Sequence, residues 1–432
     1  MNDPTYVVPE KSLIPVSDHL GRMQPILPSQ MFFISKTLET YREKNPDSPW
    51  YDASQGDGGA SLPGVPPAIL ERAGQMLVEH GTAYDPPAGT PAFRKAVIEQ
   101  YWHINSGLGL GPKNVLAAIG GRDALVKAYQ AMLALGHGRQ GDVLIVSRVP
   151  WISYNWGPYG IGANVILAPG EQENAWAYSP EGIRQCVEYA ARSGRKVAGI
   201  VITNPDNPTG RTISLEQQAK LGHAALESGV AFVLYDWIYH YITDEGPMDI
   251  NVLLHLFEPE ERKRLMFLDG LTKSLGASNI RNAHLIASEP VIDFIAARAS
   301  HSVVPDYFSQ AVAMAAFEMG FAKAARTIIE PTNASRRWFQ EFLDEHDFTS
   351  IMGKGYYAFI HVGKWLAARG WENSEALGFY LAEKHGVAIV PGVYFSVFGA
   401  EWVRFSYATP PEVTCGAAER FLQGLDSLVD LQ

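Results

Sequence analysis

Two ionisable residues stand where apolar, strand-like runs end. Lys273 comes shortly after the run 265–269, and Asp236 ends the run 231–236. A lysine in a cleft that lowers its pKa, by desolvation or through neighbouring cations, can form an imine with an aldehyde cofactor. Such a cofactor accepts electrons only while its ring nitrogen stays protonated, which requires a nearby carboxylate. Lys273 alone could be a surface charge and Asp236 alone a helix cap, but together they predict this chemistry.

Two more polar side chains follow strand-like runs. Tyr239 comes three residues after Asp236, so a turn of the chain would bring its hydroxyl to the cofactor's phenolic oxygen. Asn207 lies in the segment 203–210, where prolines and a glycine fix the backbone and can aim an amide at one oxygen atom. A core tyrosine and an ordinary turn are the alternatives.

A dianionic group would need positive charge and N–H donors. Gly121 and Arg122 lead from a strand into a helix, whose positive end can bind an anion, and Arg281 follows Lys273 by eight residues. A glycine pair before a helix is a weak motif when taken alone. The glycine-rich segment 107–111 precedes a strand and runs into a proline, so we interpret it as a loop and not as a dinucleotide fingerprint.

Two residues remain that could contact a flat ring or a carboxylate. Trp151 stands just after an apolar run, where its indole could stack on a heteroaromatic ring or fill the core. Arg404 lies inside the apolar run 402–408. A buried guanidinium needs a partner, and its planar fork matches a carboxylate. That carboxylate could be a structural ion-pair partner or the α-carboxylate of a substrate.

The elements that must position these residues can be traced through the sequence. Seven short runs, most of them apolar throughout, predict strands buried on both faces in a layered α/β domain: 115–119, 143–147, 164–168, 198–203, 231–236, 265–269 and 283–287. Helix start signals separate them, including Thr90-Pro91, Ser179-Pro180 and a capping box of Ser214 with Gln217. From about residue 291 a helical pattern dominates, and 392–408 is typical of a turn and a strand.

These patterns predict an N-terminal segment over 1–65, a large domain over 66–305 and a smaller α+β domain over 306–432. The net charge of -11 is spread along the chain, which argues against nucleic acid or an anionic membrane surface as the main partner. The two cysteines, Cys186 and Cys415, lack a metal or redox spacing, and no run is apolar enough to span a membrane. We therefore expect a cytoplasmic protein without a metal site.

Taken in order, these segments resemble the class I and II aminotransferases that use pyridoxal 5′-phosphate (PLP), of the aspartate aminotransferase-like fold type I. The resemblance runs over nearly the whole chain. It implies a large domain with a mostly parallel seven-stranded sheet between helices, plus a smaller α+β domain. It also implies that Lys273 is the Schiff-base (aldimine) lysine, that Asp236 binds the pyridinium nitrogen, and that Tyr239 and Asn207 contact the phenolic oxygen.

The resemblance assigns the remaining candidates as well. Gly121 and Arg122 match the phosphate turn, and Arg281 matches another phosphate ligand. Trp151 matches the ring-stacking aromatic residue. Gly56 and Arg404, with Asn207 beside them, would bind the substrate carboxylate. Tyr84, in the segment 84–94, looks like the tyrosine that reaches the cofactor phosphate of the neighbouring subunit, which implies a homodimer.

The sequence also departs from the family pattern. Many members have serine three residues before the lysine, whereas this chain has Gly270, which puts one phosphate contact in doubt. The family often has alanine before the tyrosine that Tyr239 matches, but Ile238 stands here, after the bulky Trp237.

The resemblance implies the transfer of an α-amino group between an L-amino acid and a 2-oxo acid. A PLP-dependent lyase, decarboxylase or oxidase is the alternative, and a non-catalytic sensor is less favoured because no winged-helix-sized domain precedes the set. The donor's side chain could contact residues 29–33, Trp237 or Tyr394, although each of these fits a hydrophobic core equally well. The sequence places no arginine to read a distal carboxylate.

Overall fold

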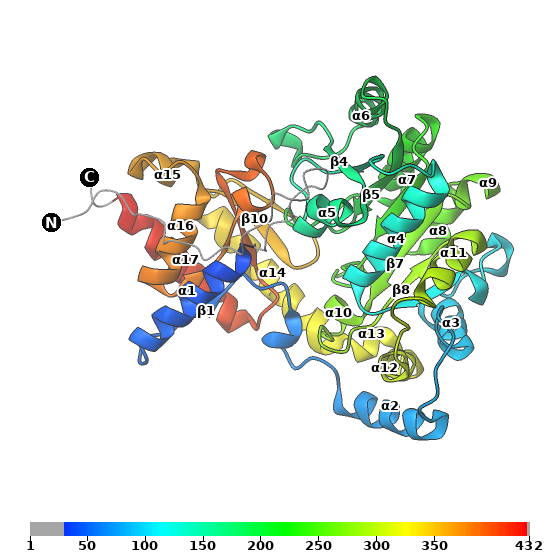
Figure 1. The fold of residues 1–432 in the computed structure, drawn as a ribbon. Helices are drawn as coiled ribbons and strands as arrows, with labels where there is room; N and C mark the ends of the chain where they lie inside the picture. The colour runs from blue at the N-terminus through cyan, green and yellow to red at the C-terminus, as the bar shows by residue number, and fades with distance from the viewer. Residues whose placement is uncertain (1–29, 430–432) are drawn as a thin grey trace.

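The computed structural model describes residues 30–429, which form a large and a small domain side by side (Figure 1). The large domain is built on a seven-stranded sheet with the order β2-β8-β7-β6-β5-β3-β4. Its strands are β2 (Val115–Ala118), β3 (Val143–Val146), β4 (Asn164–Leu167), β5 (Val197–Thr203), β6 (Phe232–Asp236), β7 (Leu265–Gly270) and β8 (Ala283–Ile286). All seven predicted strands are present. Only β8 runs antiparallel to its neighbours β2 and β7 in this sheet, so the mostly parallel arrangement is confirmed.

The sheet is buried on both faces, which explains why its strands are apolar throughout. In β7, Leu265 and Phe267 pack into one core cluster, whereas Met266 and Leu268 pack into the other. Helices cover both faces (Figure 1). The helices of this part of the chain are α2 (Pro67–His80), α3 (Pro91–Ala96), α4 (Gly121–Gly136), α5 (Ile152–Trp156), α6 (Pro180–Arg192), α7 (Leu215–Glu227), α8 (Ile250–His255), α9 (Pro259–Arg262), α10 (Leu271–Ser274), α11 (Glu289–Ala299), α12 (Tyr307–Glu318) and α13 (Phe321–Ala324).

The predicted helix starts are confirmed by their caps. Ser214 Oγ accepts a hydrogen bond from the backbone N–H of Gln217 at 3.2 Å, and the Gln217 side chain accepts from the N–H of Ser214 at 3.0 Å. Thr90 and Ser179 cap α3 and α6 in the same way through one bond each. These local bonds satisfy N–H groups that a helix end leaves free, and so they fix where the strand-to-helix connections turn.

The small domain contains a four-stranded sheet of order β12-β13-β10-β9 and a two-stranded pair of β1 and β11. The strands are β1 (Tyr51–Asp52), β9 (Ser350–Met352), β10 (Tyr357–His361), β11 (Val387–Ala388), β12 (Val390–Pro391) and β13 (Trp402–Ser406), and the helices are α1 (Met31–Lys44), α14 (Arg326–Glu345), α15 (Gly363–Arg369), α16 (Ser374–Tyr380) and α17 (Pro411–Val429). Helices dominate after residue 291, as predicted, but the same stretch also contains the short strands β9, β10, β11 and β12, which the sequence pattern did not indicate. Short apolar runs of this length do not distinguish a buried strand from a buried helix by periodicity.

The core of the large sheet extends past residue 305. Residues Ala311 to Phe317 of α12 belong to the same core cluster as one face of the sheet, and α12 lies beside α2 (Figure 1). Farther along, Phe339 and Leu343 of α14 pack into the core of the small domain. The division of the chain at residues 65 and 305 remains a prediction, and this packing favours a later second boundary, within α14.

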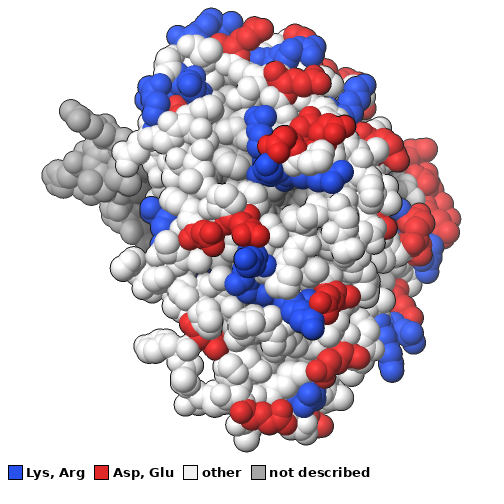
Figure 2. Space-filling model, turned by 90° about the vertical axis from the view of Figure 1, so that its right-hand side faces the viewer, with Lys and Arg blue, Asp and Glu red and all other residues white. Residues whose placement is uncertain are grey.

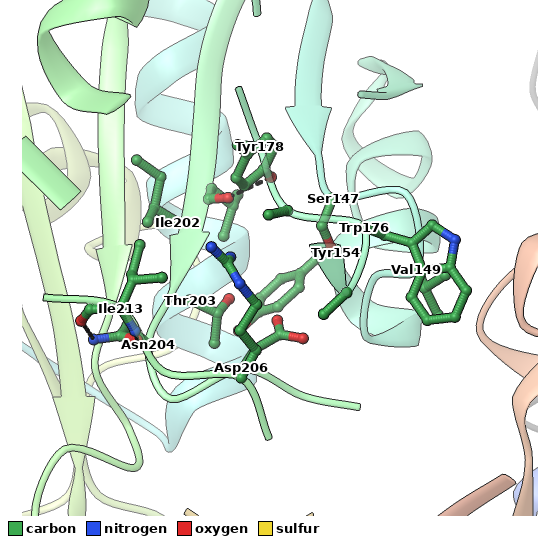
Figure 3. Close-up of a pocket in the computed structure, with 14 residues that line it drawn as sticks. Ser147, Val149, Tyr154, Trp176, Tyr178, Ile202, Thr203, Asn204, Asp206 and Ile213 are labelled. Carbon is green, nitrogen blue, oxygen red and sulfur yellow. Dashed lines mark hydrogen bonds between the residues drawn. The ribbon is translucent and has the colours of Figure 1, made fainter. Parts of the chain in front are cut away.

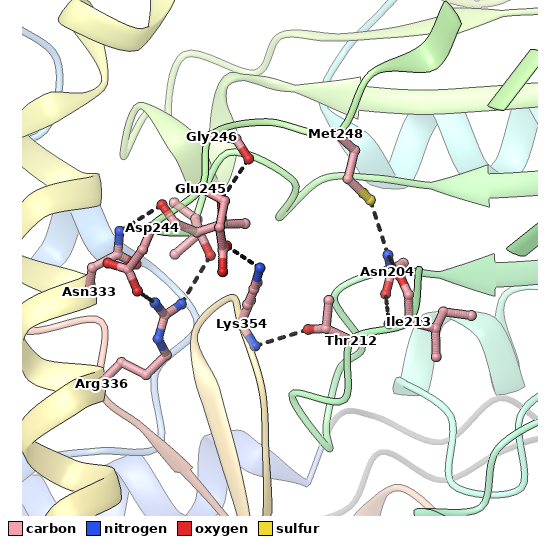
Figure 4. Close-up of polar contacts among 12 residues, drawn as sticks. Asn204, Thr212, Ile213, Asp244, Glu245, Gly246, Met248, Asn333, Arg336 and Lys354 are labelled. Atoms are coloured by element: carbon pink, nitrogen blue, oxygen red, sulfur yellow. Dashed lines mark hydrogen bonds and ion pairs between the residues drawn. The ribbon is translucent and has the colours of Figure 1, made fainter. Parts of the chain in front are cut away.

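Polar contacts join the two domains at the loop 240–248, which follows Tyr239 (Figure 4). Asp244 forms ion pairs with Arg336 of α14 and with Arg337, the latter at 2.6 Å. Glu245 pairs with Lys354, in the turn between β9 and β10. Asn333 donates a hydrogen bond to the carbonyl of Thr243 at 2.8 Å. The small domain is therefore tied to the loop that leaves the end of β6.

Charge is mixed on the surface of the large domain. Acidic and basic side chains are interspersed on the face shown in Figure 2. No helix among the described residues is long and apolar enough to cross a membrane. In the same residues, 30–429, His, Cys, Asp and Glu side chains form no group of three that could hold a metal ion.

Candidate active site

A cavity of about 540 Å³, here called the active-site cavity, lies where the two domains meet. Ten of the eleven predicted site residues line it: Gly56, Gly121, Arg122, Trp151, Asn207, Asp236, Tyr239, Lys273, Arg281 and Arg404. They come from seven separate stretches of the chain, mostly at the carboxyl ends of parallel strands, where ligands bind in open α/β sheets. The eleventh, Tyr84, lies elsewhere and is fully exposed.

Lys273 Nζ and the Asp236 carboxylate share this cavity. Burial lowers the pKa of the Lys273 ammonium, and the Arg404 and Arg122 cations lower it further, against the opposing effects of Tyr357 and Asp57. The Lys273 ammonium donates to the carbonyl of Gly56. A lysine with a lowered pKa more readily loses its proton and becomes a nucleophile or a base.

Asp236 is buried at the end of β6, where burial raises the pKa of its carboxyl to about 6. The hydroxyl of Tyr154 donates to Asp236 Oδ2 at 2.7 Å, and the N–H of Ile238 donates to Oδ1 at 3.2 Å. Both bonds favour the ionised carboxylate and so oppose part of the shift. A cationic ring nitrogen placed against Asp236 would favour the carboxylate further.

Arg404, on β13, is buried without an acidic partner among the described residues. Its Nη1 donates to Asn207 Oδ1 at 2.9 Å and its Nη2 donates to the carbonyl of Ser54 at 2.8 Å. Its Nε has no hydrogen-bond partner there. The predicted alternative of a structural ion pair is therefore wrong for residues 30–429. Two of the five guanidinium N–H groups are used, so three remain for a carboxylate.

Asn207 joins the two domains through this contact. Because its Oδ1 accepts from Arg404, its Nδ2 is left as a donor toward the cavity. The turn that carries Asn207 is fixed by Asp206, whose Oδ2 accepts from Thr209 Oγ1 at 2.5 Å. Figure 3 shows Asp206 and Thr203 beside Tyr154, at a small enclosed cavity of about 30 Å³ behind the active site.

Two tyrosines from opposite domains meet in the cavity. The hydroxyls of Tyr239 and Tyr357 lie 3.1 Å apart, and the Tyr357 ring also packs on the Arg404 guanidinium, with 4.1 Å from Cζ to the ring centroid. Burial raises the pKa of Tyr239, so its hydroxyl keeps its proton at neutral pH. A Cβ on Gly56 would lie 2.5 Å from the Tyr357 hydroxyl, so a side chain at this position would displace Tyr357.

The opposite end of the cavity is positively charged. Gly121 begins α4, whose preceding residue, Gly120, has a left-handed φ of 78°. A Cβ at Gly120 would collide with the Arg281 guanidinium, so glycine lets Arg281 approach the helix end. Arg281 itself has a φ of 58° and donates to the carbonyl of Ser278 at 2.7 Å. Arg122 lies over the Trp151 ring, with 5.5 Å from Cζ to the centroid.

These features match the chemical demands of PLP. The cavity offers a lysine of lowered pKa, a buried carboxylate, an indole, and two arginines at a helix N-terminus. Burial lowers the pKa of the Arg122 guanidinium, and repulsion from the neighbouring Arg281 cation lowers it further. A dianionic phosphate would neutralise both cations. The described residues therefore fit the cofactor.

Three neighbouring residues were not recognised from the sequence. Tyr154 is three residues from Trp151 and bonds to Asp236, but only the fold shows that α5 lies over the end of β6. Tyr357 sits in β10, which the sequence did not reveal. Asp269 accepts from His240 Nε2 at 2.7 Å and so ties the turn after β6 to the end of β7. The position of Asp269, four residues before Lys273 at the end of the same apolar run, could have indicated that it lies near the site.

The departures from the family pattern have local explanations. Gly270 pairs with Ala283 of β8, and a Cβ there would lie 2.7 Å from the carbonyl oxygen of Asn282. A serine would therefore collide with the next strand. Thr272 and Ser278 line the same cavity and offer hydroxyls in its place. Trp237 is fully buried in the core of the large domain, and its Nε1 donates to Gln218 Oε1 at 2.8 Å. Trp237 therefore does not line the cavity, whereas Ile238, which stands where the family often has alanine, does.

Comparisons with known proteins agree with the geometry. The family model "Aminotransferase class I and II" matches residues 53–421. The chain is 27% identical over 367 residues to an aspartate aminotransferase of Geobacillus stearothermophilus, covering 82% of this chain and 87% of the relative. It is also 27% identical to an aspartate/prephenate aminotransferase of Thermus thermophilus, covering 84% and 88%.

Solved structures resemble the fold over nearly the whole chain. A Thermus thermophilus aspartate aminotransferase with maleate superposes with a TM-score of 0.77 at 25% identity, covering 95% of this chain and all of the other. An aspartate aminotransferase of Thermotoga maritima gives a TM-score of 0.77 at 22% identity, with 95% and 100% covered. The predicted fold type is confirmed. The chain belongs to the aminotransferase class I and II family and is a PLP-dependent aminotransferase.

Proposed function

We propose that Lys273 is the residue that carries out amino-group transfer between an L-amino acid and a 2-oxo acid. The observation that supports this most directly is that Lys273 Nζ and the Asp236 carboxylate lie on the wall of one cavity. PLP, when bound, supplies an aldehyde that condenses with amines and a ring that withdraws electrons from them. Everything else in the reaction falls to side chains of the protein.

The cofactor-binding roles follow from the two ends of the cavity. Asp236 would hold a proton on the ring nitrogen, because a carboxylate stabilised by Tyr154 pairs with a cation. Trp151 would stack on the ring. Arg281, Arg122 and the N-terminus of α4, at Gly121, would bind the phosphate. Tyr239 and the Nδ2 of Asn207 would donate to the phenolic oxygen.

The substrate would bind on the small-domain side. Arg404 lines the cavity with Asn207 and Gly56 and keeps three N–H groups unused, so it would bind the α-carboxylate there. A substrate held in this way would have its α-carbon in the same cavity as Lys273. The freed amine of Lys273 would take the proton from the substrate's α-carbon and deliver it to the C4′ carbon of the cofactor. One amine close to both carbon atoms can act first as a base and then as an acid.

The experiment supplies purified holoenzyme with an amino donor and a 2-oxo acid and identifies the products. A new amino acid should appear in equal amount to the new oxo acid. Release of ammonia or carbon dioxide, or consumption of oxygen, would instead select the lyase, decarboxylase or oxidase reactions. A chain that never binds PLP would refute the proposal as a whole.

We also propose a homodimer in which Tyr84 completes the partner's site. Tyr84 lies between α2 and α3 and its side chain is fully exposed, as expected for a residue with a ligand outside its own subunit. Mixing the Tyr84→Ala and Lys273→Ala proteins should restore activity, since each hybrid dimer holds one site with both residues intact. Hybrids without activity, or an active monomer in light scattering, would contradict it. A cytoplasmic location stays a prediction.

A further inference from the structure

A second cavity of about 580 Å³ adjoins the active-site cavity. We call it the side-chain cavity. Met31, Arg122 and Leu125 line both cavities, so the two share part of their walls. Of the segment 29–33, which we predicted could contact a donor side chain, Gln30 and Met31 line this cavity, and Tyr394 lines it as well. Residue 29 lies outside the described residues.

The walls of the side-chain cavity are mainly apolar and come from both domains. The large domain contributes Val126 of α4 with Ile152 and Trp156 of α5. The small domain contributes Phe395, which follows η9 (Gly392–Tyr394), and Val397, which begins η10 (Val397–Gly399). Among the described residues that line it, Arg122 is the only charged one.

The side-chain cavity borders the predicted carboxylate site at Phe395. Phe395 packs on the Arg404 guanidinium, with 5.2 Å from Cζ to the ring centroid, and also lines the side-chain cavity. A substrate whose carboxylate is held by Arg404 would therefore extend its side chain past Phe395 and Met31. Arg122 stands at the junction, beside Trp151 and Arg281, where its charge faces the phosphate end. Apart from Arg122, the described lining residues offer no ionic partner.

From this geometry we propose that the preferred amino donors carry large apolar side chains, such as those of phenylalanine, leucine and methionine. The inference rests on the proposed function and names its substrate class. Each methylene that leaves water on binding favours the larger substrate, and one methylene in an apolar pocket changes kcat/KM by about tenfold or more. A carboxylate placed among these walls would lose its hydration without gaining a partner.

The first test measures the half-reaction of the PLP-loaded enzyme with single donors and no acceptor, followed by the cofactor's visible absorption. Phenylalanine and leucine should exceed alanine and aspartate in kcat/KM by at least about tenfold. Aspartate or glutamate as the fastest donor would overturn the inference and indicate that Arg122 reads a distal carboxylate. Equal rates for alanine and leucine would overturn it as well.

A second test uses binding alone, so that it does not depend on catalysis. 3-Phenylpropionate and 4-methylpentanoate carry the carboxylate and the side chain but no amine, and succinate is the acidic counterpart. Calorimetry should show the two apolar acids binding at least about tenfold more tightly than succinate. Tight binding without any amino transfer would sink the proposed function alone, whereas tighter succinate binding would sink only the substrate class.

A third test narrows the cavity. Val126 is 37% exposed on α4, so Val126→Phe can be accommodated without repacking the core. The ratio of kcat/KM for phenylalanine over alanine should fall at least about tenfold. The matched control is Val252→Phe on α8, 44% exposed and outside both cavities, which should leave the ratio unchanged. An unchanged ratio in Val126→Phe would contradict the placement of the side chain.

Discussion

The two walls of the active-site cavity hold their polar groups in different ways. On the large-domain wall, Asp236 and Lys273 stand at or just after the ends of parallel strands, where the backbone turns away from the sheet. On the small-domain wall, Arg404 and Tyr357 lie within antiparallel strands. The first arrangement fixes the proton-transferring groups at one edge of the large sheet, where their positions are rigid. The second presents groups from the small domain, which would bind the carboxylate of the substrate.

We expect the largest effect from a substitution on the large-domain wall, at Lys273. Lys273→Ala should lower turnover by about 10³-fold or more, because it removes the group that moves the proton, and it should abolish the visible absorption of the covalently held cofactor. Steady-state rates and spectra measure both. Lys220→Ala, at an exposed site on α7, serves as the control. If turnover of the Lys273→Ala protein stayed within tenfold of wild type, the assignment of proton transfer to the large-domain wall would be wrong.

The next effect tests the small-domain wall. Arg404→Ala should lower kcat/KM by about 100-fold, as expected when a buried charged partner of a carboxylate is lost. The loss should come mainly through KM for both amino and oxo acids, with cofactor absorption retained. Arg326→Ala, exposed on α14, is the control. If Arg404→Ala lost the cofactor as well as affinity for the substrate, cofactor binding and substrate binding could not be assigned to separate walls.

A third effect concerns stability and its dependence on pH. In the cofactor-free protein the pKa of Asp236 is raised from 3.8 to about 6. Because the folded state binds this proton more tightly than the unfolded state, Asp236 contributes to the free energy of unfolding. That contribution is fully present below pH 3.8 and is lost as pH rises through 6. Asp236→Asn should therefore be more stable than wild type at pH 8 by on the order of 3 kcal/mol. Urea unfolding of the cofactor-free proteins at pH 8 and pH 4 measures this, and a gain at pH 4 as large as at pH 8 would contradict it.

The smallest effect probes the contact between the walls. Tyr357→Phe removes the hydroxyl that lies 3.1 Å from that of Tyr239. A hydrogen bond of this kind contributes about 1 kcal/mol, so kcat/KM should fall about fivefold. Tyr189→Phe, exposed on α6, controls for the loss of a hydroxyl. A change of more than 100-fold would place Tyr357 among the groups that move protons.

The same contrast explains how far the sequence could predict the molecule. The large-domain residues follow short apolar runs, and a polar residue at the end of such a run is visible locally, as for Asp236 and Asn207. Arg404 was visible because a cation interrupts an apolar strand. Tyr357 was not, since an aromatic residue in an apolar strand is the expected core residue. Its partner Tyr239 is 118 positions away, and only the fold brings them together.

The buried charges of the cavity also bear on how long the chain survives in a cell. Within residues 30–429, Lys273, Asp236 and Arg404 form no ion pair, so the cavity carries desolvated charge that ligands would neutralise. A ligand that binds only the native state shifts the balance away from the unfolded chain by RT ln(1 + [L]/Kd), about 2.7 kcal/mol at a hundredfold excess over Kd. A bound cofactor would thereby raise the protein's resistance to proteolysis in addition to supporting its activity.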